Sequence, residues 1–115
     1  MAVVSTLDIH SYGVRTPELD RAVGNLRRIV EAGGRVRYGT DLGNGAIPPG
    51  IHAGEVAHLA SAGLDPEAIL RAMTLAPLRV GGEASLVGLA GNPFHDLGAF
   101  ERVALVVARG RVRRS

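Results

Sequence analysis

Residues that could carry out chemistry stand where a predicted strand ends. Gly39-Thr40-Asp41 follows a strand predicted over residues 36–38, and α/β folds bind their ligands at the carboxyl ends of strands. Asp41 could therefore face a binding site, because the small residues before it let the backbone come close to a ligand. Asp41 could instead cap or bend the loop, as aspartate often does beside glycine. The residues alone leave both interpretations open.

The histidines offer a second group of candidates. The chain has four of them: His10, His52, His58 and His95. His10 follows the first predicted strand, so it should lie at the same end of the sheet as Asp41. His52 opens a predicted helix beside the Asp41 loop and could join a site. His58 is six residues further on, does not share a helix face with His52, and is expected on the helix surface. Neither His-x-His nor His-Glu-x-x-His occurs, so these residues alone do not give the three ligands of a catalytic zinc site.

Two features could bind phosphate. The glycine-rich loop over residues 39–45 could cradle an anion, although it lacks the Lys-Ser/Thr of a P-loop and does not match the dinucleotide fingerprint. All 13 basic residues are arginine, and four of them fall together near the C-terminus: Arg109, Arg111, Arg113 and Arg114. That cluster could contact phosphates or could be a solvated chain end. No aromatic residue accompanies it for base stacking, so no nucleic-acid partner is expected.

The elements that must position these residues follow from periodicity and capping. An apolar strand is predicted over residues 2–9. Thr16-Pro17-Glu18 predicts a helix start, because it combines an N-cap, a proline suited to the first turn and a favourable negative charge. Gly33-Gly34 ends that helix. Further helices are predicted over residues 51–62 and after Asp65, and strands over residues 84–90, 103–108 and 111–113. The strand–helix–strand–helix order predicts parallel strands covered by helices.

Composition narrows the class of protein. The chain has 115 residues, 46% hydrophobic and 21% charged, with a net charge of +2, which is typical of one soluble globular domain. Cysteine is absent, which excludes disulfides and thiolate metal sites. No apolar run reaches the ~18 residues of a membrane span, and no basic segment precedes the first apolar residues. A cytoplasmic protein without a membrane partner is therefore expected.

Several blocks of sequence together resemble a known family. They are Asn25 to Gly33, then Val36-Arg37-Tyr38-Gly39-Thr40-Asp41, a glycine/proline loop, His52 and Glu55, and Ala62-Gly63-Leu64 followed by residues 66–77. In this order and spacing they resemble the C-terminal portion of the metal-dependent amidohydrolase superfamily, in the imidazolonepropionase-like or dihydroorotase-like range. The resemblance covers nearly the whole chain.

The resemblance implies a fold and an activity. Residues 1–77 would be the last part of a (β/α)8 TIM-type barrel, and residues 78–115 would be strands of a small flanking β-sandwich. The activity would be hydrolysis of carbon–nitrogen bonds other than peptide bonds, with a small amide or cyclic amide as substrate. Asp41 would be both a ligand of a divalent metal, zinc being expected, and the acceptor of the attacking water's proton. His10, Asn44 and His52 would contact the substrate.

The chain also departs from that family. The first-strand His-x-His, the bridging lysine or acid and two later histidine ligands are missing, and a barrel needs ~200 residues or more. We therefore expect a fragment that is inactive alone and that pairs with a complementing chain or a second copy. The alternative is a truncated, non-catalytic α/β binding or interaction module.

Overall fold

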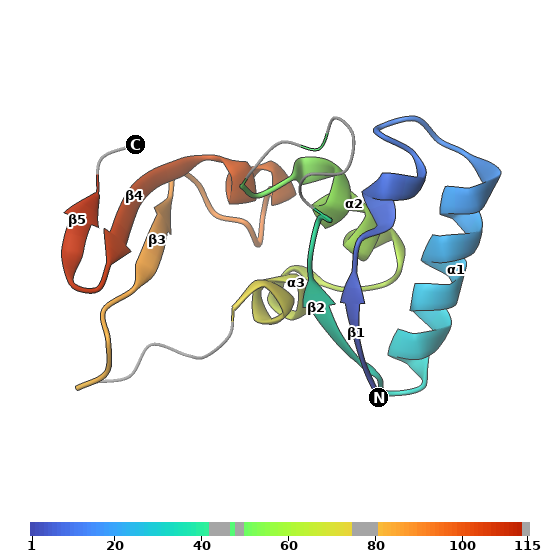
Figure 1. Ribbon diagram of the computed structural model, residues 1–115, viewed down its shortest axis with the longest axis horizontal. Helices are drawn as coiled ribbons and strands as arrows, with labels where there is room; N and C mark the ends of the chain where they lie inside the picture. The colour runs from blue at the N-terminus through green and yellow to red at the C-terminus, as the bar shows by residue number, and fades with distance from the viewer. Residues whose placement is uncertain (42–46, 48–49, 75–80, 114–115) are drawn as a thin grey trace.

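The computed structural model describes residues 1–41, 47, 50–74 and 81–113. It is a mixed α/β arrangement (Figure 1) with the elements β1 (Ala2–Ser5), 3₁₀ helix η1 (Leu7–His10), α1 (Pro17–Glu31), β2 (Arg35–Tyr38), α2 (Ala53–Ser61), α3 (Pro66–Met73), β3 (Leu86–Leu89), 3₁₀ helix η2 (Leu97–Glu101), β4 (Val103–Ala108) and β5 (Arg111–Arg113). No helix in these ranges is both long and apolar enough to cross a membrane.

The strands β1 and β2 form a parallel pair, as the strand–helix–strand order predicts. Val3 pairs with Val36 and Ser5 with Tyr38, and these residues face the helices, whereas Val4 on the other face is 66% exposed. The sheet has two strands, and the described residues contain no closed barrel. The α/β class is therefore confirmed, but a barrel wedge is not.

Helix capping follows the sequence closely. The Thr16 side chain accepts a hydrogen bond from the backbone N–H of Leu19, and the Asp65 side chain accepts one from the backbone N–H of Ala68. Each of these first-turn donors would otherwise lack a partner. Both predicted helix starts are therefore confirmed, and α2 lies within the predicted range 51–62.

The first strand is shorter than predicted. It ends at Ser5, and residues 7–10 form η1 instead of continuing to residue 9. The backbone N–H groups of Ser11 and Tyr12 both donate to the Asp8 carbonyl oxygen, at 2.9 and 2.7 Å. These local bonds turn the chain away from the sheet and bury the Asp8 side chain beside α2.

The hydrophobic core lies between the parallel sheet and the helices. Its fully buried members include Val56 and Leu59 from α2, Ile69 from α3 and Phe100 from η2. Phe100 is 2% exposed, so the C-terminal part of the chain contributes the largest aliphatic or aromatic side chain of this group. Burial of Phe100 therefore joins η2 to α2, two elements far apart in sequence.

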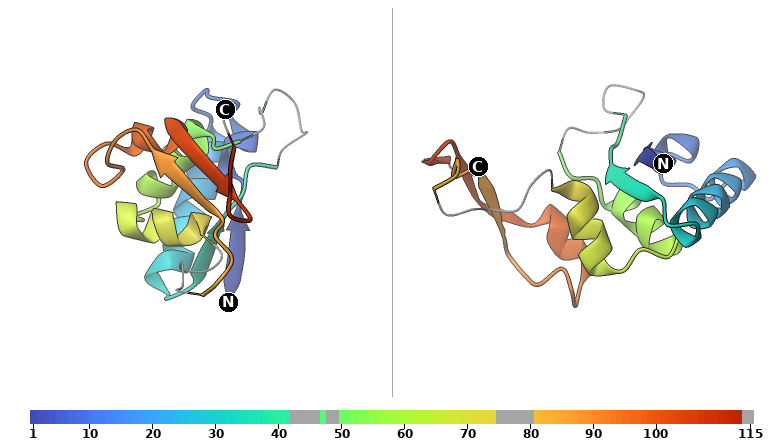
Figure 2. Two further views of the ribbon diagram at one scale, coloured as in Figure 1. Left: turned by 90° about the vertical axis from the view of Figure 1, so that its left-hand side faces the viewer. Right: turned by 90° about the horizontal axis from the view of Figure 1, so that it is seen from below.

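The antiparallel sheet β3–β4–β5 projects from the α/β part of the molecule (Figure 2). Arg109 and Gly110 join β4 to β5 with positive φ values of 50° and 73°, as a two-residue hairpin turn of the primed type requires. The predicted hairpin and its strand over residues 111–113 are confirmed. One sheet face is apolar and partly open to solvent, and it carries Leu86, Leu105, Val107 and Val112.

Truncation of Phe100 tests whether η2 belongs to the core. Phe100→Ala should lower the free energy of unfolding by about 3–5 kcal/mol, because it removes a buried ring and leaves a cavity. Phe94→Ala is the matched control, since Phe94 is 52% exposed, and it should change stability by less than about 0.5 kcal/mol. Urea unfolding followed by circular dichroism measures both, and equal effects would show that η2 does not stabilise the core.

Candidate functional site

The most concentrated polar chemistry of the described residues surrounds one buried carboxylate. Asp8 on η1 is 3% exposed. Its Oδ2 lies 2.6 Å from His52 Nε2, and its Oδ1 lies 2.9 Å from His58 Nε2. Ser11 Oγ donates to the same Oδ1 at 3.0 Å. We call these four residues the Asp8 cluster.

The charge of Asp8 determines how the two imidazoles are protonated. Burial alone raises the pKa of Asp8, but hydrogen bonds from His52, His58 and Ser11 outweigh it and hold this pKa below its usual 3.8. An ionised carboxylate only accepts hydrogen bonds, so each facing Nε2 carries a hydrogen. Each Nδ1 is then the ring nitrogen that can accept a hydrogen bond.

A second buried carboxylate, that of Glu55, binds the backbone of Asp8. Glu55 on α2 is 0% exposed. It accepts hydrogen bonds from the Ser5 hydroxyl and, at 2.8 Å, from the backbone N–H of Asp8. Glu55 thereby connects α2 to the end of β1 and to the start of η1. Every buried side-chain nitrogen and oxygen in the described ranges has a partner.

The N-terminus of α2 brings the histidines to Asp8. His52 is the N-cap residue and has extended backbone angles, and its backbone N–H donates to Tyr38 Oη at 2.7 Å. This bond holds the start of α2 against β2. A Cβ on Gly54 would lie 2.9 Å from His52 Nε2 and 3.0 Å from Asp8 Oδ1, so glycine is what allows the imidazole and the carboxylate to approach over this turn.

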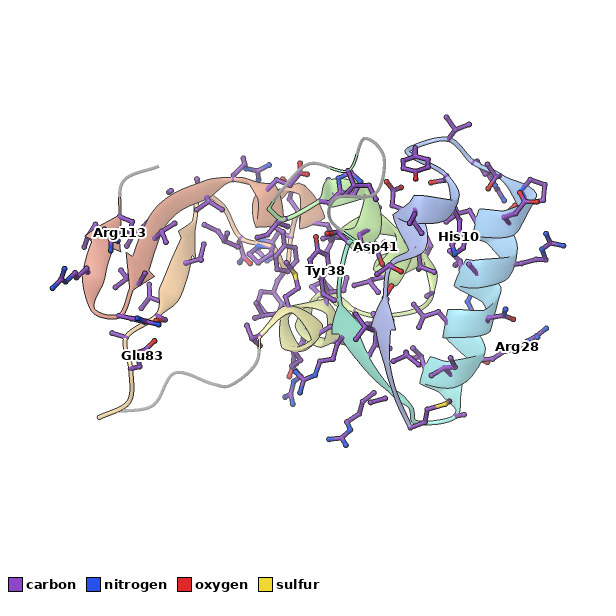
Figure 3. All side chains as sticks on the ribbon, viewed as in Figure 1. His10, Arg28, Tyr38, Asp41, Glu83 and Arg113 are labelled. Atoms are coloured by element: carbon purple, nitrogen blue, oxygen red, sulfur yellow. The ribbon has the colours of Figure 1, made fainter. Side chains whose placement is uncertain are left out.

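The residues predicted from sequence lie in different places (Figure 3). Asp41 lies three residues after Tyr38, the last residue of β2, is exposed, and has a φ of 57°. His10 is also exposed, and its carbonyl oxygen accepts from Thr16 Oγ1 at 2.9 Å. Asn44 lies outside the described residues. Among the predicted site residues, His52 alone joins the Asp8 cluster.

Sequence reasoning missed most of this cluster. The prediction that His58 lies on the helix surface is wrong, since its side chain is 18% exposed and contacts Asp8. His52 and His58 converge because His52 precedes the helix instead of forming part of it. Two signals could have identified the buried acids. Asp8 interrupts an apolar segment, and Glu55 is four residues from Leu59 on the buried face of its helix, where a charged side chain needs partners.

The Asp8 cluster has the carboxylate and imidazole groups of a proton-transfer site. It does not have the nucleophile–base pair or the metal ligands of a complete catalytic site. An aspartate that orients a histidine is a common general-base arrangement. Here, however, the Ser11 hydroxyl donates to the same carboxylate, so it does not form a nucleophile–base pair with either imidazole. In the described ranges, no group of three or more acidic, histidine or cysteine side chains could hold a metal ion. The geometry therefore fits a structural connection between η1 and α2.

His58 and Ser11 nevertheless border open space. A cavity of about 600 Å³ lies between the loop after η1, α1 and α2, and Arg15, Asp20, Arg27 and Ser61 also line it. Its basic and acidic groups are mixed, and Arg15 is already paired with Asp20 at 3.1 Å. The lining therefore does not single out one class of ligand.

Comparison with known proteins adds no family assignment. No family model matches the chain, and no curated protein matches its sequence.

The lowered pKa of Asp8 predicts a pH dependence of stability. A carboxyl group whose pKa is lower in the folded state stabilises the fold above its usual pKa and loses this contribution as the pH falls through the folded value. The melting temperature of the wild type should therefore exceed that of Asp8→Asn above about pH 5, and the difference should shrink below about pH 4. Asp41→Asn, an exposed control, should track the wild type throughout. A difference of equal size at pH 3 and pH 6 would contradict the assignment.

The role of Glu55 predicts a loss of folding stability that does not involve a histidine. Glu55→Ala leaves the Ser5 hydroxyl and the Asp8 N–H without their acceptor, and each such group costs about 1–3 kcal/mol when buried. We expect the free energy of unfolding to fall by about 2 kcal/mol or more in denaturant titrations. Glu67→Ala, which removes an exposed pair with Arg71, should cost less than about 1 kcal/mol.

Proposed function

We propose that this chain is part of a hydrolase of the metal-dependent amidohydrolase superfamily that acts on carbon–nitrogen bonds other than peptide bonds. Its substrate class is a small amide or cyclic amide. The chain supplies Asp41 as the group that accepts and holds the proton of the attacking water. Asp41 is also one ligand of the metal, and the other ligands come from residues outside this chain, on a complementing polypeptide segment.

The position of Asp41 carries this proposal. Asp41 lies three residues after Tyr38, the last residue of β2, at the carboxyl end of two parallel strands, where α/β folds bind ligands. Its left-handed backbone, with a φ of 57°, is uncommon for a residue other than glycine, and such backbone often occurs at functional sites. The sequence blocks that resemble the superfamily assign the same residue.

The part of the chain that the structure describes does not fit a metal site by itself. A catalytic zinc ion needs three protein ligands. The resemblance assigns Asp41 as a ligand in this chain, and the described residues hold no suitable group of three. The divalent metal, expected to be zinc, would activate water at the completed site. His10, Asn44 and His52 are the residues proposed to contact the substrate.

Exposed valines on both sheets support a larger assembly. Val4 is 66% exposed on the open face of the β1–β2 sheet, which also carries Arg35 and Arg37, and Val112 is 64% exposed on the antiparallel sheet. In the proposed enzyme, the first face turns toward the interior of the (β/α)8 barrel. The second packs in the flanking β-sandwich, so that residues 1–77 and 78–115 belong to different domains. Parallel sheets are normally covered on both faces.

The test compares the longest reading frame that encodes this chain with its Asp41→Asn variant. The expressed protein should hydrolyse a cyclic amide such as hydantoin or dihydrouracil in the presence of zinc. Asp41→Asn should lower kcat/KM by about 10²-fold or more, because it removes the proton acceptor. Asp20→Asn is the control, since Asp20 is exposed on α1, and it should leave kcat/KM within about twofold.

Two results would refute the hydrolase. One is an Asp41→Asn protein with unchanged kcat/KM. The other is a reading frame that encodes neither a His-x-His sequence nor two further histidines before this segment.

A non-catalytic binding or interaction module is the second candidate. The observation that favours it is that the described residues enclose their own core and satisfy their own buried polar groups. As a module, the 115-residue chain alone would melt cooperatively, and Asp41→Asn would have no effect on its binding activity.

A further inference from the structure

Three arginines line one hollow at the end of the antiparallel sheet. The hollow has a volume of about 510 Å³, and its lining residues are Ala108, Arg109, Arg111 and Arg113. None of these described lining residues is acidic. Figure 3 shows Arg113 on β5, at the end of the molecule opposite α1. We call Arg109, Arg111 and Arg113 the arginine hollow.

An ordered hairpin presents these side chains. Arg111 pairs with Ala108 and Arg113 with Val106 in the β4–β5 register, so Arg111 and Arg113, two residues apart, emerge on the same face of β5. Arg109 occupies the turn, and its backbone N–H donates to Ser85 Oγ at 3.1 Å. Gly110 donates to the Ala84 carbonyl oxygen at 2.7 Å. These bonds fix the turn against the segment before β3.

The ion pairs of the described residues leave this group out. Arg15, Arg21, Arg71 and Arg102 are each within 3.3 Å of an acidic oxygen. None of the three arginines of the hollow takes part in an ion pair there. Like charges held close together repel one another and destabilise a sheet. An anion that binds among the three guanidinium groups would remove this repulsion.

We propose that the arginine hollow binds a phosphate-bearing ligand. Arginine is suited to this task because its planar guanidinium donates two parallel hydrogen bonds to phosphate oxygens. Three such groups match a ligand with two or more linked phosphates better than a single carboxylate. The site lies on β5 and its turn, away from Asp41, which follows β2 (Figure 3), so this inference does not depend on the proposed hydrolase.

The ligand is recognised by its phosphates and not by bases. The four aromatic residues of the chain are Tyr12, Tyr38, Phe94 and Phe100, and none lines the hollow. The described lining therefore offers no aromatic surface on which a base could stack, unlike the sites of single-strand binding proteins. A free polyphosphate and a nucleic-acid backbone offer the same phosphate chemistry, and the experiment separates them.

The experiment measures binding of inorganic pyrophosphate by isothermal titration calorimetry at low salt. The test variant is Arg111→Gln/Arg113→Gln, which keeps polar, exposed side chains on β5. The control is Arg21→Gln/Arg28→Gln, which removes the same charge from the exposed face of α1. A third variant, Arg109→Asn, places a residue that is favoured at a primed turn. Circular dichroism melting shows that each variant is folded.

We expect the Arg111/Arg113 variant to raise the Kd for pyrophosphate about tenfold or more, since it removes the charge-assisted hydrogen bonds of two of the three guanidinium groups. The α1 control should change the Kd less than about twofold. Arg109→Asn should raise the Kd while leaving the melting temperature unchanged or higher. An abasic and a normal ten-nucleotide single strand, measured alongside, should bind equally. If both strands bind equally and no more tightly than pyrophosphate, the site is assigned to free polyphosphate. If both strands bind more tightly than pyrophosphate, the site is assigned to a nucleic-acid backbone.

Three results would overturn the proposal. The first is a Kd for pyrophosphate that the Arg111/Arg113 variant leaves unchanged. The second is an equal loss in the α1 control, which would show an effect of net charge alone. The third is much tighter binding of the normal strand than of the abasic one, which would require recognition of bases elsewhere.

Discussion

The interaction on which the described α/β part depends is the contact of the Asp8 carboxylate with His52 and His58. An ionised carboxylate 3% exposed is costly unless donors surround it. Here Ser11, close to Asp8 in the chain, supplies one donor. His52 at the N-cap of α2 and His58 in its second turn supply the other two. Glu55 then accepts from the backbone of Asp8. Two acids and two imidazoles thus join η1 to α2, and the aliphatic core packs around this joint.

This joint also explains why a sheet of two parallel strands can exist in the structure. Such a pair is marginal in isolation, because parallel strands are usually part of a larger sheet that is covered on both faces. Val3 and Val36 pack on the core, while Ser5 and Tyr38, further along the same strands, hydrogen-bond to Glu55 and to the His52 N–H. The inner face is therefore fixed by polar contacts as well as by apolar packing.

Local features could be predicted from the sequence, and long-range ones could not. Thr16 and Asp65 cap helices through bonds to residues three positions away, so their effect can be seen in a short window. The hydrogen bonds from Asp8 to the two histidines join residues 44 and 50 positions apart. The spacing of apolar residues along the chain does not reveal such contacts. The same limit applies to Phe100, whose short 3₁₀ helix has no recurrent apolar spacing. The predicted end of β1 at residue 9 is also wrong: the strand ends at Ser5, and the η1 turn that follows places Asp8 in contact with residues more than 40 positions away.

Asp8 and Asp41 show why sequence position alone does not define a working site. Both residues follow a parallel strand at its carboxyl end. Asp8 has its oxygens occupied by Ser11, His52 and His58, so little capacity is left for a ligand. Asp41 is exposed, and within the described ranges its carboxylate accepts no hydrogen bond from the protein. A carboxylate that must hold a proton or a cation needs this spare capacity. The Asp8 carboxylate therefore has the environment of a structural group, whereas the chemical role of Asp41 belongs to the proposed completed site.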